Sequence, residues 1–562
     1  RTKIHEFYLE ISTNLHRYST KYVVIYLNAS FLRILRLKYA FLVKNIPRNL
    51  FPHKCLVGIQ QNKFDIVLDK CSGQHSFYRY VTIKGTPSYR YRNFFSVFAQ
   101  DPEPIEPWTG VRDALEFGNC CSQKDMLSHE LVGNDDCLYL NVYKPMKPTS
   151  TKMSVMVWIH GGAFMMGSGS DEYYGPVYFM RKDVILVTIN YRLGVLGFLN
   201  LEHEVAPGNQ GLKDQVMALK WVQENICNFG GDPNNVTIFG ESAGASSVHY
   251  LTLSPLAHGL FHKAIIQSGV AFNPWAIISE KPSKYGFQLA AKLGETSTDP
   301  ETVVEFLRTI DAKTLVDLET KLLTPKGKMY FTERYATFGM FAPGVDDKSA
   351  NPFMPQHPAV RAKAGIQVPL LIGFNSNEGS MFLSSKFIFF LVQFFTFLIE
   401  KTADKYANYL SDVMFLQGIH EVVNVQMERN NHPTYFYKFT YDPEHSLMKA
   451  TFNITLPGAT HAEELQYLFY ANLGKKMGIE PFEVGSEMYR MMECFTQMWT
   501  DFAKTGYVFS YLANLLSNIS LAWRSIQMPN THVYYNDRSI GDSSEILNIV
   551  EKRVFETKRY LN

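Results

Sequence analysis

Runs of consecutive apolar residues, rather than alternating apolar and polar positions, dominate the middle of this sequence. They occupy residues 154–159, 183–189, 236–239, 263–266, 368–373 and 434–439. A strand that is apolar at nearly every position is typical of a sheet whose two faces are both covered. We therefore predict six buried β-strands.

Between these runs the apolar positions recur with the spacing of an α-helix. In residues 211–229 they fall at three- and four-residue steps, at Leu212, Val216, Leu219, Val222 and Ile226. This spacing places them on one face of a helix. Strands that alternate with helices predict an α/β fold, with a mostly parallel central sheet and helices on both faces.

One large domain is expected to span residues 79–562, because no internal repeat and no low-complexity linker divides it. Residues 1–78 contain neither a clear periodicity nor a motif. We interpret them as an irregular N-terminal extension and assign them no function.

The charge and hydropathy of the chain exclude several classes of partner. Its net charge of +2 over 562 residues gives no reason to expect nucleic acid or an electrostatic membrane anchor. Residues 22–43 are rich in apolar residues but contain Arg33, Arg36 and Lys38, and the apolar run at 387–399 is too short to cross a bilayer. No transmembrane segment is predicted; we expect the 387–399 run to be buried, with an interfacial segment as the alternative.

Cysteines and glycosylation sequons bear on the compartment. The seven cysteines are Cys55, Cys71, Cys120, Cys121, Cys137, Cys227 and Cys494. They form no Cys-x-x-Cys pair and no His/Cys cluster with metal-ligand spacing, so no metal site is predicted. Asn-x-Ser/Thr sequons at Asn28, Asn235, Asn453 and Asn518 favour the secretory pathway over the cytoplasm.

A serine stands in the short motif Gly240-Glu-Ser-Ala-Gly244, between a predicted strand and a predicted helix. Gly-x-Ser-x-Gly in that context is typical of a nucleophile elbow, a strained turn that lifts the Ser242 hydroxyl clear of the sheet. The alternative is a tight turn that merely needs small residues. A serine nucleophile also needs a base and donors for the oxyanion that develops on the carbonyl. The His160-Gly-Gly-Ala-Phe164 stretch, at the end of an upstream strand, could supply such donors; the alternative is a glycine turn without a ligand.

Six motifs together resemble the type-B carboxylesterase/cholinesterase family, and most of all the insect carboxylesterases. They are Glu106-Pro-Trp-Thr-Gly110, Asp136-Cys-Leu-Tyr-Leu-Asn-Val142, His160-Gly-Gly-Ala-Phe164, Asn190-Tyr-Arg-Leu-Gly194, Asn209-Gln-Gly-Leu-Lys-Asp-Gln215 and Gly240-Glu-Ser-Ala-Gly244. The resemblance is nearly continuous from residue 101 to 275 and returns in blocks after that. It implies an α/β-hydrolase fold and a serine ester hydrolase that needs no cofactor and no metal.

The same resemblance assigns roles to particular residues. It implies a catalytic triad of Ser242, Glu378 and His461, with Asp346 and Asp412 as fallback acids. It places the oxyanion donors at the main-chain N–H groups of Gly162, Ala163 and Ala243. It also implies a supporting polar network of Glu241, Ser268 and Glu464, and a disulfide between Cys121 and Cys137, for which Cys120 is an adjacent competitor.

Two features narrow the substrate. Residues 122–136, the loop that the disulfide would close, contain no tryptophan to face a quaternary ammonium, which argues against acetylcholine. By resemblance, insect juvenile hormone esterases usually carry glutamine where Glu241 stands, which argues against that hormone. We therefore predict a carboxylesterase for short-chain or apolar esters, including xenobiotics. The alternatives are a catalytically inactive binding or adhesion protein of the same fold, and a lipase that meets aggregated lipid through the 387–399 run.

Overall fold

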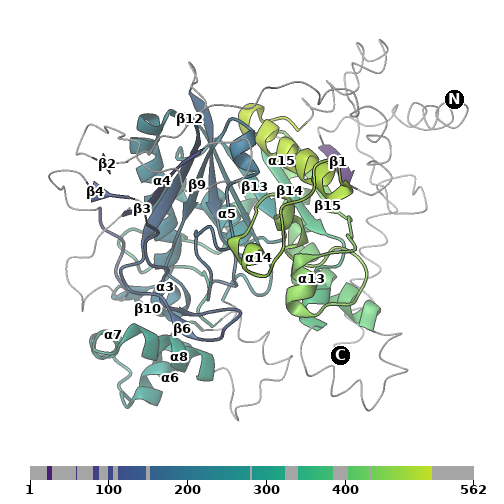
Figure 1. Ribbon diagram of the computed structural model, residues 1–562. Helices are drawn as coiled ribbons and strands as arrows, with labels where there is room; N and C mark the ends of the chain where they lie inside the picture. Colours follow the sequence, from purple (N-terminus) through teal and green to yellow (C-terminus); the bar gives the residue numbers. More distant parts are fainter. Residues whose placement is uncertain are drawn as a thin grey trace, which may run out of the picture.

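The computed structural model describes residues 22–27, 58–59, 80–87, 99–104, 112–114, 116–146, 152–278, 281–322, 340–383, 403–429 and 432–508. Its centre is a nine-stranded sheet in the order β1-β15-β14-β13-β12-β8-β9-β7-β3 (Figure 1). The strands are β1 (Tyr22–Leu27), β3 (Tyr80–Pro87), β7 (Tyr139–Pro145), β8 (Met153–Ile159), β9 (Ile185–Ile189), β12 (Gly231–Glu241), β13 (Lys263–Gln267), β14 (Leu370–Asn375) and β15 (Thr434–Phe439).

The sheet is mostly parallel, as predicted. Only β3 and β7 run antiparallel to their neighbours, at one edge. All six predicted strands are present, with shifts of a few residues at their ends; the run at 183–189, for example, begins as β9 at Ile185. β1 pairs in parallel with β15, although the sequence predicted no strand in the first 78 residues. The domain boundary near residue 79 stays a prediction.

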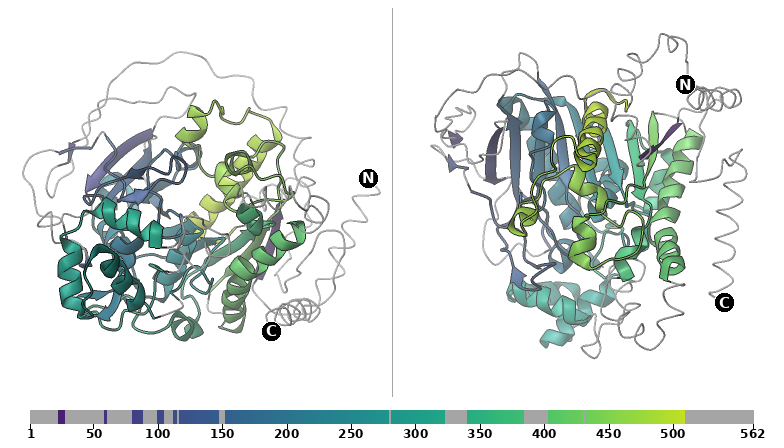
Figure 2. Two further views of the ribbon diagram at one scale, coloured as in Figure 1. Left: turned by 90° about the horizontal axis from the view of Figure 1, so that it is seen from below. Right: turned by 45° about the vertical axis from the view of Figure 1, so that its right-hand side comes forward.

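Helices cover both faces of the sheet, as the two views of Figure 2 make clear. The α-helices include α3 (Gly194–Phe198), α4 (Gln210–Asn225), α5 (Ala243–Leu253), α6 (Ser283–Leu293), α7 (Pro300–Arg308), α8 (Ala312–Leu322), α10 (Pro358–Arg361), α12 (Gln417–Arg429), α13 (Leu447–Phe452), α14 (Asn472–Lys476) and α15 (Glu487–Thr505). Residues 403–411 are also helical. α4 continues as a 3₁₀ turn, η3 (Ile226–Phe229), so the predicted 211–229 helix is α-helical only to Asn225. α6, α7 and α8 lie together at the lower end of the molecule in Figure 1.

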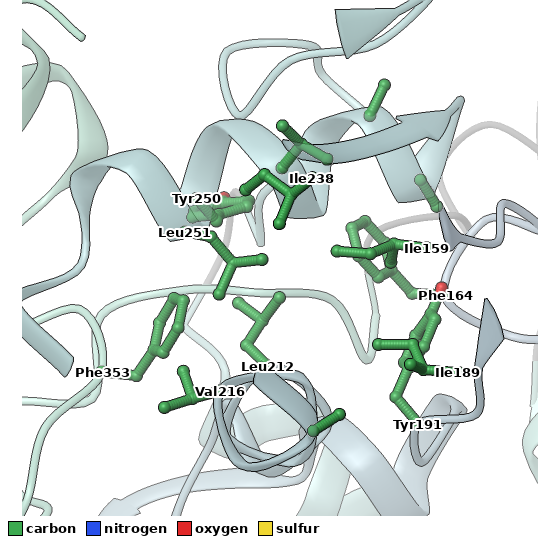
Figure 3. Close-up of a cluster of buried hydrophobic side chains, with 14 of the residues drawn as sticks. Ile159, Phe164, Ile189, Tyr191, Leu212, Val216, Ile238, Tyr250, Leu251 and Phe353 are labelled. Atoms are coloured by element: carbon green, nitrogen blue, oxygen red, sulfur yellow. The ribbon is translucent and has the colours of Figure 1, made fainter. Parts of the chain in front are cut away.

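Two separate apolar cores explain why the strands contain continuous apolar runs. On one face, Ile159 and Ile238 pack with α4 and α5, where Leu212, Val216 and Leu251 meet them (Figure 3). On the other face, neighbouring strand positions such as Trp158 and Phe239 pack with α15. Successive strand side chains point to opposite faces, so a sheet buried on both sides needs an apolar residue at each position.

Smaller elements complete the description. Three two-stranded ribbons pair β2 (Gly58–Ile59) with β4 (Arg112–Asp113), β5 (Gln123–Lys124) with β6 (Leu131–Val132), and β10 (Asn200–His203) with β11 (Ala206–Pro207). Short helical turns are η2 (Phe179–Arg181), η4 (Pro255–Ala257), η5 (Ala362–Ala364), η6 (Glu378–Leu383), η8 (Glu463–Tyr467) and the π-helical η7 (Asp412–Leu416). No helix among the described residues is both long and apolar enough to cross a membrane. The 387–399 run lies outside the described residues.

Two of the four sequons can be compared in the structure. Asn453 is exposed and ends α13 in a left-handed conformation. Asn235 instead uses its side-chain nitrogen, the atom that would carry a glycan, to donate to Ser154 Oγ at 2.9 Å. Asn453 is thus the better placed of the two for glycosylation, which stays a prediction.

Candidate active site

Ser242 lies in a sharp turn between β12 and α5. Its φ of 59° and ψ of −123° are rare for a residue with a side chain, and such a conformation costs about 1–3 kcal/mol. The turn is held because Ser242 N donates to Gln267 O at 2.9 Å, while Ser242 O accepts from Ser246 N at 2.9 Å. The hydroxyl is therefore carried by a backbone that is fixed on both sides.

The two glycines of the motif are required by close backbone packing. A Cβ at Gly244 would lie 2.0 Å from the carbonyl oxygen of Ile159, and one at Gly240 would lie 2.5 Å from the carbonyl carbon of Gly244. Neither neighbour is a side chain that could move aside. The motif thus lets α5 start directly against β8, as expected of a nucleophile elbow.

Glu378 and His461 meet close to the end of β14. Glu378 begins η6, just after β14, and its Oε1 accepts from the main-chain N–H of Asn375 at 2.6 Å. Its Oε2 accepts from His461 Nδ1, also at 2.6 Å. His461 comes from the loop between α13 and η8, and both side chains are buried. The carboxylate thus fixes the orientation of the imidazole.

The other ring nitrogen of His461 faces a second carboxylate. His461 Nε2 lies 3.0 Å from Glu241 Oε1, in the residue that precedes Ser242. Across the described part of the chain, no hydrogen bond joins Ser242 Oγ to His461. The imidazole thus lies between two buried carboxylates, with the serine next to one of them in sequence.

The predicted network behind the histidine is only partly joined. Glu464 Oε1 accepts from Gln267 Nε2 at 2.9 Å, and its Oε2 accepts from Asn375 Nδ2 at 2.6 Å. Burial and the neighbouring carboxylates raise the pKa of Glu464 to about 8. Ser268 is buried, and its hydroxyl has no partner among the described residues. The sequence did not single out Gln267 or Asn375.

The loop of residues 160–167 lies against the serine. A Cβ at Gly161 would be 3.2 Å from the Cβ of Ser242. Gly162, Ala163 and Phe164 have φ values of 106°, 56° and 61°. Within the described ranges, the main-chain N–H groups of Gly162, Ala163 and Ala243 donate to no other residue, so they remain available to a ligand.

Aromatic packing anchors the start of this loop. His160 is buried and stacks on Tyr191 with ring centroids 4.4 Å apart, while Tyr191 Oη donates to His160 O at 2.9 Å. Burial lowers the pKa of His160 to about 4, so the ring is neutral at physiological pH. Tyr191 belongs to the Asn190-Tyr-Arg-Leu-Gly194 motif, but nothing in the sequence revealed that it supports His160.

The disulfide between Cys121 and Cys137 is present, with an S–S distance of 2.03 Å. It closes a segment of residues 121–137, the disulfide hairpin, which contains β5 and β6. Cys120, the predicted competitor, is a free thiol, as are Cys227 and Cys494.

The two fallback acids lie in structural positions. Asp346 accepts from the main-chain N–H groups of Phe353 and Met354, at 2.9 and 2.6 Å. Asp412 begins η7. Neither is among the groups that contact His461 in the described residues.

The described residues contain no group of three or more His, Cys, Asp or Glu side chains arranged to hold a metal ion.

The fold and these motifs agree with comparisons to known proteins. The profile of the carboxylesterase family matches residues 98–390 and 398–545. Juvenile hormone esterase of Tribolium castaneum is 36% identical over 464 residues, which cover 72% of this chain and 76% of the relative. Esterase FE4 of Myzus persicae is 33% identical over 453 residues, covering 72% and 77%.

Solved structures give the same result. The crystal structure of juvenile hormone esterase from Manduca sexta superposes with a TM-score of 0.69 at 28% identity, and the match covers 82% of this chain and 92% of that one. The chain therefore belongs to the carboxylesterase family, has its α/β-hydrolase fold, and is a carboxylic ester hydrolase.

Proposed function

We propose that the chain hydrolyses short-chain or apolar carboxylic esters, including xenobiotic esters, through an acyl-enzyme on Ser242. The observation that carries this proposal is the pair of 2.6 Å contacts of Glu378, one to the main chain of Asn375 and one to His461. A buried carboxylate that holds an imidazole beside a nucleophile elbow is the arrangement that activates a serine.

In the proposed mechanism, His461 Nε2 takes the proton of Ser242 while Oγ attacks the ester carbonyl. The N–H groups of Gly162, Ala163 and Ala243 donate to the resulting oxyanion. His461 then gives its proton to the leaving alcohol, and the acyl-enzyme is left. Water, activated by the same imidazole, attacks the acyl carbon and releases the acid and the free serine. Glu378 orients the ring and stabilises its charge throughout.

The 3.0 Å contact of His461 Nε2 with Glu241 has a consequence for this mechanism. Nε2 must face Ser242 Oγ to take the proton, so part of its interaction with Glu241 has to be given up or shared. A small rotation of the imidazole about its bond to Glu378 would suffice. Catalytic hydrogen bonds are often loose in a free enzyme and tighten when substrate binds.

The substrate range is proposed from the residues near the serine. The disulfide hairpin offers no tryptophan, which disfavours choline esters. The two juvenile hormone esterases compared above bear that name, but Glu241 stands where we expected glutamine in an enzyme for that hormone. A panel of short alkyl esters, aryl esters and juvenile hormone itself separates these possibilities.

Of the two alternatives from the sequence, the inactive binding protein no longer stands, because the chain belongs to the carboxylesterase family and is an ester hydrolase. The lipase alternative makes a different prediction. A lipase would be faster on micellar than on soluble esters. For the compartment, we propose the secretory pathway, because a disulfide such as Cys121–Cys137 forms and persists in oxidising surroundings.

The test is hydrolysis of a short p-nitrophenyl ester with and without an organophosphate, followed by peptide mass mapping. We expect turnover to disappear as one adduct forms on Ser242. A folded preparation that gave neither turnover nor an adduct would refute the acyl-enzyme route.

The pH dependence should report the carboxylates around His461. Burial alone would lower the pKa of His461, but Glu241 and Glu378 outweigh burial and hold that pKa well above 6.5. The imidazole must be neutral to act as the base, so kcat/KM should fall as the pH drops through this raised pKa. Replacing Glu241 with glutamine removes one of the raising charges, and we expect the acidic limb of the pH profile to move to lower pH.

A matched control is Glu463→Gln, because Glu463 is a buried glutamate two residues after His461 whose carboxylate instead accepts from Ser446 Oγ at 2.7 Å. This variant should leave the acidic limb in place. An unchanged limb in Glu241→Gln would show that the charge of Glu241 does not act on the base.

A further inference from the structure

The 160–167 loop holds a conformation that its residues do not favour. Three consecutive residues, Gly162, Ala163 and Phe164, have positive φ, and two of them carry side chains. Residues with a Cβ rarely adopt such angles unless the surrounding structure imposes them. Something outside the loop must therefore keep Gly162 and Ala163, with their free N–H groups, in place.

Gln123 of β5 is bonded to the far end of this loop. Its Oε1 accepts from Gly167 N at 2.6 Å, and its Nε2 donates to Gly167 O at 2.9 Å. The same Nε2 donates to Cys121 O at 3.0 Å. The side chain is buried, so water competes little for these bonds. One amide thus holds both polar groups of a loop residue and ties them to its own strand.

Gly167 and Gly162 are closely coupled through the main chain of the loop. Met166, next to Gly167, donates its N–H to Gly162 O at 3.0 Å. A Cβ at Gly162 would lie 2.1 Å from Met166 O, which shows how closely the two ends of the turn approach. Gly167 itself packs against the ring of His160, since a Cβ there would be 2.4 Å from His160 Nδ1. Moving Gly167 must therefore move the segment that carries the donors.

The two hydrogen bonds between Gln123 and Gly167 form a clamp on the loop, and Gln123 is itself held in place. Gln123 pairs with Val132 across the β5–β6 ribbon, and Cys121, two residues before it, is joined to Cys137. The clamp thus connects two segments that are 44 residues apart in sequence, and the disulfide hairpin supplies the rigid side.

We propose that Gln123 is a positioning residue for ester hydrolysis: it holds the 160–167 loop so that the N–H groups of Gly162 and Ala163 point at the oxyanion. This inference rests on the proposed function, since it assumes the acyl-enzyme route through Ser242. Gln123 touches neither substrate nor Ser242; it acts through Gly167.

The test is Gln123→Met in the full chain, a change that keeps the length of the side chain and removes its hydrogen bonds. Misplaced donors should weaken binding of the oxyanion, not of the uncharged ester. We expect kcat to fall about 10–100-fold with KM changed by no more than about 3-fold, because small misplacements in an active site act on the transition state.

An inhibitor pair separates this role from a general loss of structure. Ser242 Oγ attacks the carbonyl carbon of an alkyl trifluoromethyl ketone and forms a hemiketal. The carbonyl oxygen becomes an oxyanion, and the serine proton moves to His461. The affinity for this ketone should fall by about the same factor as kcat. The matching methyl ketone, which remains a ketone, should bind Gln123→Met as it binds the wild type.

Gln426→Met is the matched control. Gln426 is buried and makes the same two-point clamp on a main chain, accepting from Ile366 N at 2.5 Å and donating to Ile366 O at 3.3 Å. It lies on α12, outside the proposed site. The Gln426→Met variant should lower the thermal unfolding midpoint much as Gln123→Met does, without changing the ratio of the two inhibitor affinities.

If Gln123→Met does not fold, Gln123→Glu decides, because glutamate can still accept from Gly167 N but cannot donate to Gly167 O or Cys121 O. Wild-type kcat and inhibitor ratio in either variant would overturn the role of Gln123 alone. A wild-type enzyme that formed no hemiketal and turned over no ester would instead overturn the proposed function, and this inference with it.

Discussion

Replacing Ser242 with alanine is expected to lower kcat for a p-nitrophenyl ester by about 10⁵–10⁶-fold, since the nucleophile and its base act as a unit. The hydroxyl oxygen forms the only covalent bond to the acyl group in the proposed route. Alanine would keep the strained backbone of the elbow, with its φ of 59°, so the thermal unfolding midpoint should change little. The measurement is steady-state turnover on protein whose folding has been checked by circular dichroism.

Ser246→Ala is the control for this prediction. Ser246 lies one turn further along α5, is fully buried, and has no hydrogen-bond partner for its hydroxyl in the described part of the structure. Its loss should leave kcat near the wild-type value. If Ser242→Ala kept more than about one hundredth of the activity, a different nucleophile would have to be sought, because general binding effects cannot account for that much rate.

Glu378→Ala should have the second largest effect, a fall in kcat of about 10³–10⁴-fold with little change in KM. The carboxylate keeps Nδ1 of His461 protonated and so leaves Nε2 free to take the serine proton. Without it, the imidazole loses a 2.6 Å hydrogen bond and the main-chain N–H of Asn375 loses its acceptor. Some loss of stability should accompany the loss of activity, because the Asn375 N–H is then buried without a partner.

Asp346→Asn tests the alternative acid. Its carboxylate accepts from two main-chain N–H groups and lies 3.9 Å from Lys213, so the variant should unfold at a lower temperature. Activity per folded molecule should nevertheless stay close to that of the wild type. Should Asp346→Asn lose as much kcat as Glu378→Ala, the assignment of Glu378 as the acid would be wrong.

The strands of the sheet could be predicted because each shows its burial in its own short run of apolar residues. β8 and β9 are each apolar at all positions but one, and that pattern has few other uses in a chain that alternates strands and helices. The ends of the strands were less predictable. β9 starts two residues late because Asp183 adopts a positive φ of 51°, which a strand does not accommodate.

Residues of the candidate site were predictable to different degrees. Ser242 could be recognised from the sequence because glycines flank it. The structure explains why they must be small: a Cβ at Gly244 would meet Ile159, and a Cβ at Gly240 would meet Gly244. Glu378 and His461 lie in loops without a periodic pattern, so only the resemblance to a family indicated them. Gln123 and Asn375 were missed because their bonds span 44 and 89 residues, and no local signal records such a contact.

The arrangement of the proposed triad also makes ester turnover a measure of how far folding has proceeded. Ser242 follows β12, Glu378 follows β14, and His461 comes after β15, so the three side chains meet only when four neighbouring parallel strands are in register. Such pairings have a high contact order and form slowly. During synthesis the proposed nucleophile leaves the ribosome long before the proposed acid and base, so under this proposal an incomplete chain carries a serine that cannot react. Recovery of ester turnover after denaturation therefore measures long-range order, which far-ultraviolet dichroism, dominated by helices that form locally, would register too early.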